Sequence, residues 1–165
     1  MESIVIPDTF SSISDRVFWG CTALKKVKLP NNMWYIAHYA FWDCIALEEI
    51  NFPEKVTSIE HITFSGCNSL TNVYIPDQIT SIGTGAFYEC AGLTEISLPA
   101  GLKALSATAF YRCPALRDVY FRGTKAQWEA LDTQETSFEG RNMEWEDIHY
   151  TVHCSDGDIT YPLSE

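Results

Sequence analysis

The chain has 165 residues, of which 46% are hydrophobic and 13% aromatic, a composition that fits one packed domain and excludes a disordered or collagen-like chain. Its 22 acidic residues outnumber 11 basic ones, and the formal charge of −11 argues against nucleic acid or an anionic lipid surface as a partner. No run approaches the roughly 18 apolar residues of a membrane span, so we expect no membrane insertion. The start, Met1 to Ile4, lacks the basic and apolar segments of a signal peptide, so we expect a soluble chain.

The sequence repeats itself every 23 residues. Proline, cysteine and phenylalanine each recur at this interval without a slip, and aliphatic positions follow the same period. A fixed period of this length indicates a solenoid, in which every coil packs on its neighbours because none can bury its own apolar face. The three most distinctive series are Pro7, Pro30, Pro53, Pro76 and Pro99; Cys21, Cys44, Cys67, Cys90 and Cys113; and Phe18, Phe41, Phe64, Phe87 and Phe110.

Each repeat is predicted to begin with a short strand. Leu70, Val73 and Ile75 show the spacing, in which inward residues alternate near the end of the strand before a proline stops the ladder. The later Ala-Phe-x-x-Cys segment has helical spacing but is too short for a stable α-helix, so a 3₁₀ piece or a single turn is expected. The sequence therefore predicts six strands in one parallel sheet, with short turns on the opposite side.

The repeat unit, as it reads from Leu93 to Ala115, resembles the treponemal or BspA-type leucine-rich repeat. The resemblance covers Met1 to about Phe121 in about five repeats and implies an α/β-type right-handed leucine-rich-repeat solenoid. It also implies a bacterial protein, at the cell surface or secreted, that mediates adhesion or protein contact. The departures from the unit are Val17 and Thr63 in place of alanine, Ser65 in an aromatic series, and Arg122 in place of proline.

Residues 122–165 are predicted to form a C-terminal cap of the same domain, and parts of this stretch also resemble a C-terminal element of such proteins. Thr124 followed by Gln127 is a capping-box pattern, which predicts a helix over 125–131. Asp156-Gly157 between two strand-like runs predicts a hairpin over 148–161 with an Asp-Gly turn. The stretch 132–147 between them predicts an acidic loop.

The N-terminal coil has no predicted cap. Terminal repeats need a covering surface, and nothing in the sequence before Met1 supplies one. An open apolar edge is therefore expected. It predicts either a fragment of a longer solenoid or possible self-association through this edge.

The sequence predicts no metal site, no cofactor and no catalytic constellation. The five cysteines of the repeat are expected to be buried free thiols, because their parallel side chains and odd number disfavour disulfides. No Cys-x-x-Cys pair occurs, and His38 and His61, one period apart, are expected to be a solvent-facing pair without a third ligand. Cys154 lies outside the series; the nearby His149 and His153 would lie on the opposite face of a strand from it. No Ser/His/Asp arrangement can be assembled, so the chain is not expected to be an enzyme.

The strongest candidate site is the outward face of the strands, where varied side chains of successive coils lie side by side and can bind a protein partner. Its competing interpretations are a merely solvated sheet face and a structural spacer of a longer solenoid. A second candidate is the series that follows the phenylalanines, Trp19, Trp42, Ser65, Tyr88 and Tyr111, which is either packing at the core edge or a groove for a peptide or a sugar. The predicted binding residues are Lys26, Lys28, Glu49, Asn51, Asn72, Tyr74, Glu95, Ser97, Asp118 and Tyr120.

Overall fold

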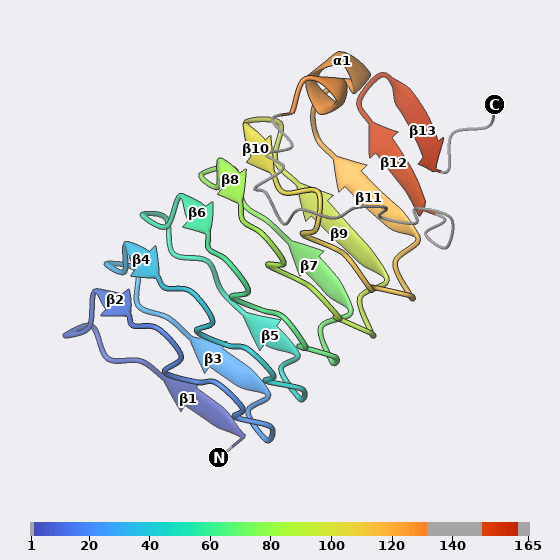
Figure 1. Ribbon diagram of the computed structural model, residues 1–165. Helices are drawn as coiled ribbons and strands as arrows, with labels where there is room; N and C mark the ends of the chain where they lie inside the picture. The colour runs from blue at the N-terminus through green and yellow to red at the C-terminus, as the bar shows by residue number, and fades with distance from the viewer. Residues whose placement is uncertain (1, 132–149, 162–165) are drawn as a thin grey trace.

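The computed structural model describes residues 2–131 and 150–161, which form a solenoid of stacked coils running from the N-terminus to the C-terminus (Figure 1). One strand of each coil lies in a row along one side. Neighbouring strands of this row pair in parallel, except at one point near the middle, and their buried and exposed residues alternate. They are β1 (Ser3–Val5), β3 (Lys26–Lys28), β5 (Glu49–Ile50), β7 (Asn72–Tyr74), β9 (Glu95–Leu98) and β11 (Asp118–Phe121).

A second row of two-residue parallel strands follows the proline of each coil. Each of these strands buries its second residue, such as Ile59 or Ile82. Sequence reasoning did not foresee this row, since two residues are too few to show an alternation. Its members are β2 (Ser12–Ile13), β4 (Tyr35–Ile36), β6 (Ser58–Ile59), β8 (Ser81–Ile82) and β10 (Ala104–Leu105).

The Ala-Phe-x-x-Cys segments form the predicted turns and carry the core. The rings of Phe41, Phe64 and Phe87 are fully buried and stack coil on coil at centroid distances of 5.5 Å. The Cys67 thiol donates to the Phe41 carbonyl at 3.3 Å, and the Cys90 thiol to the Phe64 carbonyl at 3.1 Å. All cysteines in the structure are free thiols, which confirms that the series is not a disulfide ladder. Burial raises the pKa of Cys44 to about 12, and it also raises the pKa of Cys67.

Two residues in most coils, four positions apart, adopt left-handed φ values between 55° and 70°. This region is uncommon for residues other than glycine, and Ile62, at 55°, is β-branched. Hydrogen bonds between coils hold such corners, as where the Asp43 amide donates to the Ser65 carbonyl at 2.9 Å. The two series are Arg16, Tyr39, Ile62 and Gly85, and then Gly20, Asp43, Gly66, Glu89 and Arg112.

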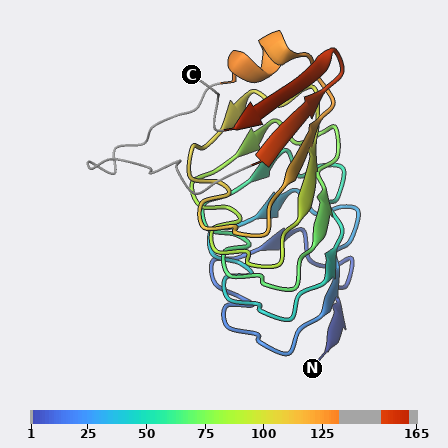
Figure 2. The same ribbon diagram turned by 90° about the vertical axis from the view of Figure 1, so that its right-hand side faces the viewer.

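Helix α1 (Lys125–Glu129) begins at the predicted capping box, in which Thr124 and Gln127 bond each other's backbone amides. The helix is shorter than the predicted 125–131, because Ala130 already forms its C-terminal cap. The Trp128 ring contacts Phe121 at 5.5 Å between centroids. The helix thus covers the end of the core, as Figure 2 shows at the C-terminal end of the stack.

The hairpin of β12 (Tyr150–Cys154) and β13 (Gly157–Tyr161) extends the sheet, since β12 pairs in parallel with β11. The predicted Asp-Gly turn is wrong by one position. Ser155 and Asp156 form the two-residue loop, and Gly157, with φ 127°, is the first residue of β13. The predicted hairpin residues 148 and 149 and the acidic loop 132–147 lie outside the described residues.

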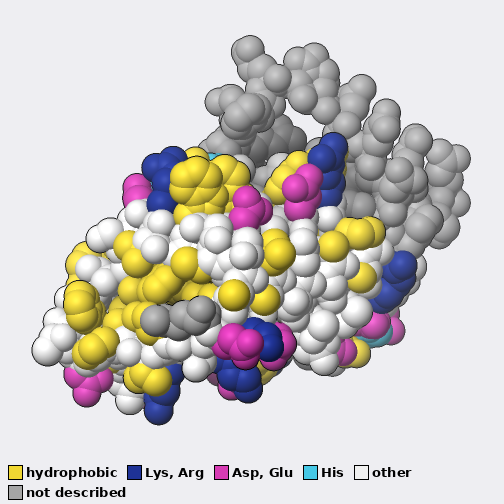
Figure 3. Space-filling view, turned by 90° about the horizontal axis from the view of Figure 1, so that it is seen from below, with side chains coloured by type: hydrophobic (Ala, Val, Ile, Leu, Met, Phe, Trp, Pro, Cys, Tyr) yellow, Lys and Arg dark blue, Asp and Glu magenta, His cyan; other side chains and the backbone are white. Residues whose placement is uncertain are grey.

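The N-terminal end of the solenoid is apolar and uncovered by described residues, as expected (Figure 3). Phe18 and Cys21 are half-buried, whereas Phe41 and Cys44, one coil later, have no exposed surface. Val17 and Trp19 are 52% and 53% exposed. Self-association through this end remains a prediction.

The stacking of the coils predicts that alanine substitutions at two glycines differ sharply in their effect on the stability of the protein. A Cβ on Gly92 would overlap the Asn68 carbonyl oxygen of the preceding coil, so Gly92→Ala is expected to destabilise the protein by about 1–3 kcal/mol. A Cβ on Gly101 would lie 3.9 Å from its nearest neighbour, so Gly101→Ala should change stability by less than about 0.5 kcal/mol. Denaturant unfolding followed by circular dichroism measures both, and equal midpoints would contradict the close coil contact.

Candidate binding site on the strand face

Nine of the ten predicted binding residues lie in the first row of strands, on its outward side, which we call the strand face, and Asn51 directly follows β5. Between them, Val27, Val73, Ile96 and Val119 point into the core and are buried, as a period of two requires. The ten side chains are exposed or half-buried: Lys26, Lys28, Glu49, Asn72, Tyr74 and Tyr120 are exposed, and Asn51, Glu95, Ser97 and Asp118 are half-buried.

The hydrogen-bond ladder of this row is interrupted once, between β5 and β7. Elsewhere the second residue of each repeat donates its amide to the coil before it, as Glu48 does to the Lys25 carbonyl at 2.8 Å and Thr94 to the Thr71 carbonyl at 2.9 Å. The equivalent bond from Thr71 to Glu48 is missing. Among the described residues, no backbone hydrogen bond joins β5 to β7.

Side-chain amides take over hydrogen bonds around the interruption. The Leu29 amide donates to Asn51 Oδ1 at 2.7 Å, and Asn51 Nδ2 donates to the Leu29 carbonyl at 3.0 Å. In other coils this amide donates to a backbone carbonyl, as Ile75 does to Ser97 at 2.8 Å. On the other side, Gln78 Nε2 donates to the Phe52 carbonyl at 3.3 Å. The side chains thus hold the coil where the ladder does not.

The same coil also has a different pairing partner in the second row. There the ladders join β2 to β4, and separately β6, β8 and β10. The coil that contains β5 and β6 therefore pairs with the preceding coil on the strand face and with the following coil in the second row. This change of partner opens a space on the strand face.

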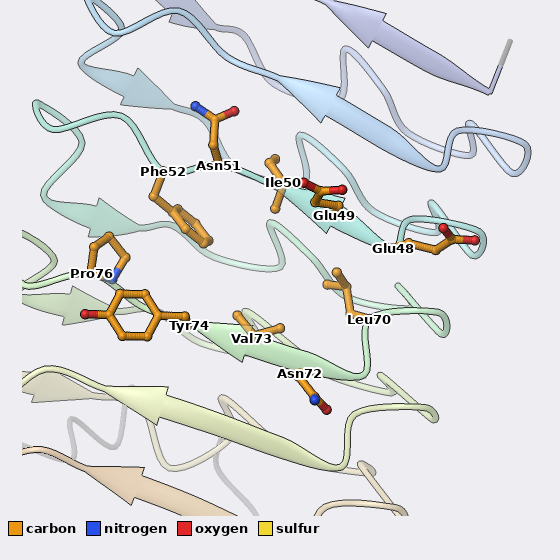
Figure 4. A pocket seen from close by; sticks show the side chains of 10 residues that line it. All are labelled: Glu48, Glu49, Ile50, Asn51, Phe52, Leu70, Asn72, Val73, Tyr74 and Pro76. Atoms are coloured by element: carbon orange, nitrogen blue, oxygen red, sulfur yellow. The ribbon is translucent and has the colours of Figure 1, made fainter.

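The space is a cleft of about 390 Å³ between β5 and β7, which we call the β5/β7 cleft (Figure 4). Ile50 and Phe52 extend from the β5 side, and Val73 forms part of its apolar wall on β7. Four of the ten predicted residues line it, Glu49, Asn51, Asn72 and Tyr74; the other six lie outside it. The complete lining is Glu48, Glu49, Ile50, Asn51, Phe52, Leu70, Asn72, Val73, Tyr74 and Pro76.

Arg122 fixes the β7 side of the cleft. Its guanidinium lies 4.5 Å from the centroid of the Tyr74 ring and donates to the Ile75 carbonyl at 2.8 Å and to Asp77 at 2.7 Å. It also donates to Ser97 Oγ at 2.8 Å. Sequence reasoning treated Arg122 only as a departure from the repeat; the replaced proline was the available signal. One side chain thus spans three coils of the strand face.

An ion pair borders the cleft on the β5 side. Lys26 Nζ lies 2.9 Å from Glu49 Oε2. Their hydrogen bond and charge attraction raise the pKa of Lys26 and lower the pKa of Glu49. Both groups are exposed, so the pair orients the Glu49 carboxylate more than it stabilises the fold.

The hairpin adds His153 to the far end of the strand face, a place that sequence reasoning did not foresee for it. Its Nε2 lies 2.8 Å from Asp118 Oδ1 and its Nδ1 lies 3.1 Å from Asp158 Oδ1. Its ring stacks on Tyr120 at 4.8 Å. The hydrogen bond to Asp118, followed by that to Asp158, raises the pKa of His153.

The histidine pair of the repeats faces solvent only in part, which corrects the prediction of a fully solvent-facing pair. His38 and His61 are both half-buried, 6.2 Å apart between ring centroids, and the Tyr39 ring packs edge-on against His61. Burial lowers the pKa of His61. Among the described residues there is no cluster of three metal-ligating side chains. Cys154 is half-buried, and burial raises its pKa.

The aromatic series after the phenylalanines mainly packs on itself. The rings of Trp19 and Trp42 stack at 5.1 Å, and Tyr88 lies 5.7 Å from Tyr111. Ser65 is buried between the two pairs. Packing at the core edge therefore accounts for most of this series.

Comparison with known proteins identifies the same repeats that the sequence and the structure show. The BspA type leucine rich repeat region matches residues 1–117 in 6 copies. The chain belongs to this family. A comparison with curated proteins gave no match. No helix in the described part of the chain is long and apolar enough to cross a membrane.

Three solved structures share the fold. A leucine rich cell surface protein from Faecalibacterium prausnitzii is 32% identical with a TM-score of 0.81, over 83% of this chain and 36% of that one. The leucine rich repeat protein of T. pallidum is 30% identical with a TM-score of 0.68, over 72% of this chain and 58% of that one. The pneumococcal vaccine antigen PcpA, at 24% identity and a TM-score of 0.63 over 73% of this chain and 30% of that one, shares the fold alone. The chain thus spans between about a third and three fifths of these relatives.

The charge of His153 is expected to control how firmly the hairpin is held. Because its pKa is raised in the folded state, its stabilisation is fully present below the ordinary value of 6.5 and is lost as the pH rises through the folded value. The melting temperature of His153→Gln should therefore fall furthest below that of the unaltered protein near about pH 5.5, and the gap should narrow by about pH 8.5.

Two measurements serve as controls for this prediction. His61→Gln should show the opposite trend, because burial lowers the pKa of His61 and its charging at low pH opposes folding. Hydrogen exchange at the Thr151 amide, which donates to Arg117 at 2.8 Å, locates the effect in the hairpin. A gap that does not change with pH would contradict the role of the charge.

Proposed function

We propose that the chain is a non-enzymatic protein-binding module of a bacterial surface protein and that it binds its partner through the strand face. The observation that carries the proposal is the β5/β7 cleft, which opens in the middle of an otherwise continuous sheet and is lined by four of the outward residues. A relative that is 32% identical is itself a leucine rich cell surface protein. Cell-surface location and adhesion are parts of this proposal.

The chemistry of the strand face supports a protein partner. Tyr74 and Tyr120 are 61% and 42% exposed on the sheet, and tyrosine is enriched where proteins contact each other. The cleft, at about 390 Å³, lies within the range of ligand pockets and combines an apolar interior with carboxylates at Glu48 and Glu49. An apolar segment with basic flanks complements it better than an acidic ligand does.

The alternative is a structural role, in which the chain is a stacking segment of a longer solenoid. The apolar N-terminal end favours it, because Val17 is exposed there whereas its equivalents Ala40, Ala86 and Ala109 are buried. In this case the strand face would have no ligand of its own.

A peptide library displayed on phage tests the proposal. Peptides selected on the unaltered protein are expected to lose at least about tenfold in affinity for Tyr74→Ala, because the ring and its contact with Arg122 are lost. Tyr88→Ala, which removes an aromatic ring of similar size from the opposite side of the coil, should keep full affinity. Fluorescence anisotropy measures each dissociation constant.

Two outcomes would overturn strand-face binding. Selected peptides that bind Tyr74→Ala and Tyr120→Ala as tightly as the unaltered protein, and lose affinity for Tyr88→Ala, would move the site to the turn side. A library that yields no enriched peptide, with a correctly folded target, would favour the structural role.

Self-association through the apolar end has its own test. Light scattering over a concentration series is expected to show dimers that disappear in the double variant Val17→Lys and Trp19→Glu, because charged side chains oppose burial of the end. Ile45→Lys, an exposed apolar residue away from the first coil, is the control and should leave the mass unchanged. A monomer at every concentration would rule out this association.

A further inference from the structure

We propose that the β5/β7 cleft receives one extended polypeptide segment with alternating basic and apolar residues, which completes the interrupted ladder with its backbone. This inference rests on the proposed function, since it names the ligand of the strand face. Its first support is the row of hydrogen bonds that the interruption removes.

Three backbone amides lack a hydrogen bond that the equivalent amides of other coils make. The equivalents of Asn72 donate to the preceding coil, as Glu95 does to Thr71 at 3.3 Å and Asp118 to Thr94 at 3.4 Å. The equivalents of Phe52 donate to the following coil, as Ile6 does to Lys28 at 2.9 Å. Thr71, Asn72 and Phe52 have no such backbone bond in the described chain.

Phe52 and Asn72 line the cleft from its two sides, and Thr71 directly precedes Asn72. Unpaired backbone amides on both sides of an opening between strands match an extended backbone, which presents carbonyl acceptors along both of its edges. The geometry therefore favours a strand-like ligand.

The side chains of the cleft indicate which residues such a segment carries. Successive side chains of a strand point to opposite sides, so every second one would face Ile50, Phe52 and Val73 and should be apolar. The residues between them would lie near the rim, where Glu48 makes no ion pair within the described chain and Glu49 holds only Lys26. Lysine or arginine suits these positions, and the overall charge of −11 adds to the attraction.

The cleft is held open before any ligand arrives. Asn51 ties the β5 side to Leu29 through two hydrogen bonds, and Arg122 ties the β7 side through Ile75 and Asp77. A site that does not have to reorganise loses less free energy on binding. The two sides therefore act as fixed edges for an added strand.

The experiment uses the acetylated and amidated peptide Lys-Ile-Lys-Ile-Lys as the probe. It should bind the full chain, and titration in an NMR experiment should slow hydrogen exchange at the amides of Thr71 and Asn72. The same peptide with both isoleucines N-methylated keeps its charge and side chains but lacks two donors, and should bind at least about tenfold more weakly. Glu-Ile-Glu-Ile-Glu should not bind measurably.

A pair of charge reversals tests the rim. Glu48→Lys should weaken binding of the basic peptide by about fivefold, because one attraction is replaced by a repulsion. Glu54→Lys changes the overall charge by the same amount at an exposed residue outside the cleft and should change the affinity much less. Equal effects of both would mean general charge attraction and overturn the proposed rim contacts.

The outcomes separate this inference from the proposed function. If peptides from the library bind the strand face but neither N-methylation nor Glu48→Lys weakens the probe, the strand-like ligand is wrong and strand-face binding stands. If Thr71 and Asn72 are protected without peptide in a protein that dimerises, the occupant is a second copy of the chain, which overturns a foreign segment. If neither the library nor the probe binds, both proposals fail.

Discussion

Burial of the phenylalanine and cysteine side chains between coils is the constraint on which the rest of the structure depends. A single coil has no second layer to cover its apolar side, so the burial of Phe64 depends on Phe41 before it and Phe87 after it. The thiol of each coil then donates to a carbonyl of the coil before it, which keeps this polar atom satisfied inside the core. Since every coil uses the same contact, its length is fixed at 23 residues.

That fixed core leaves the opposite side of each coil free to vary. Between most coils of the strand face the backbone ladder runs without a break, and the outward side chains are not needed to maintain it. Between β5 and β7 the core stacks as elsewhere, with rings 5.5 Å apart, while the ladder is open. The coil can change its partner on the strand face because the core contact does not depend on it, and because Asn51 and Gln78 supply hydrogen bonds from side chains.

The periodic part of the fold was predictable from the sequence, and the site only in outline. Repetition of Phe, Cys and Pro indicated the strands, the turns and the free thiols, and alternation placed Tyr74 and Tyr120 outward. The left-handed corners were not predictable, because Ile62 and Glu89 are not residues that favour that conformation. The cleft was also missed. Asn51 looked like one more polar outward residue, and its bond to Leu29 depends on how two coils approach each other.

Arg122 shows how such a repeat protein can vary its strand face without altering its core. It follows the last strand of the row, where earlier coils have proline, yet its guanidinium reaches back past Ser97 to the ring of Tyr74. Where the sheet is intact, only its side chains can contact a ligand, because its backbone groups are already paired with each other. An open stretch offers backbone groups as well, at the place where Arg122 holds one edge and Asn51 the other. Under the proposed strand-like binding, a ligand would therefore gain most binding free energy where the repeat is least regular.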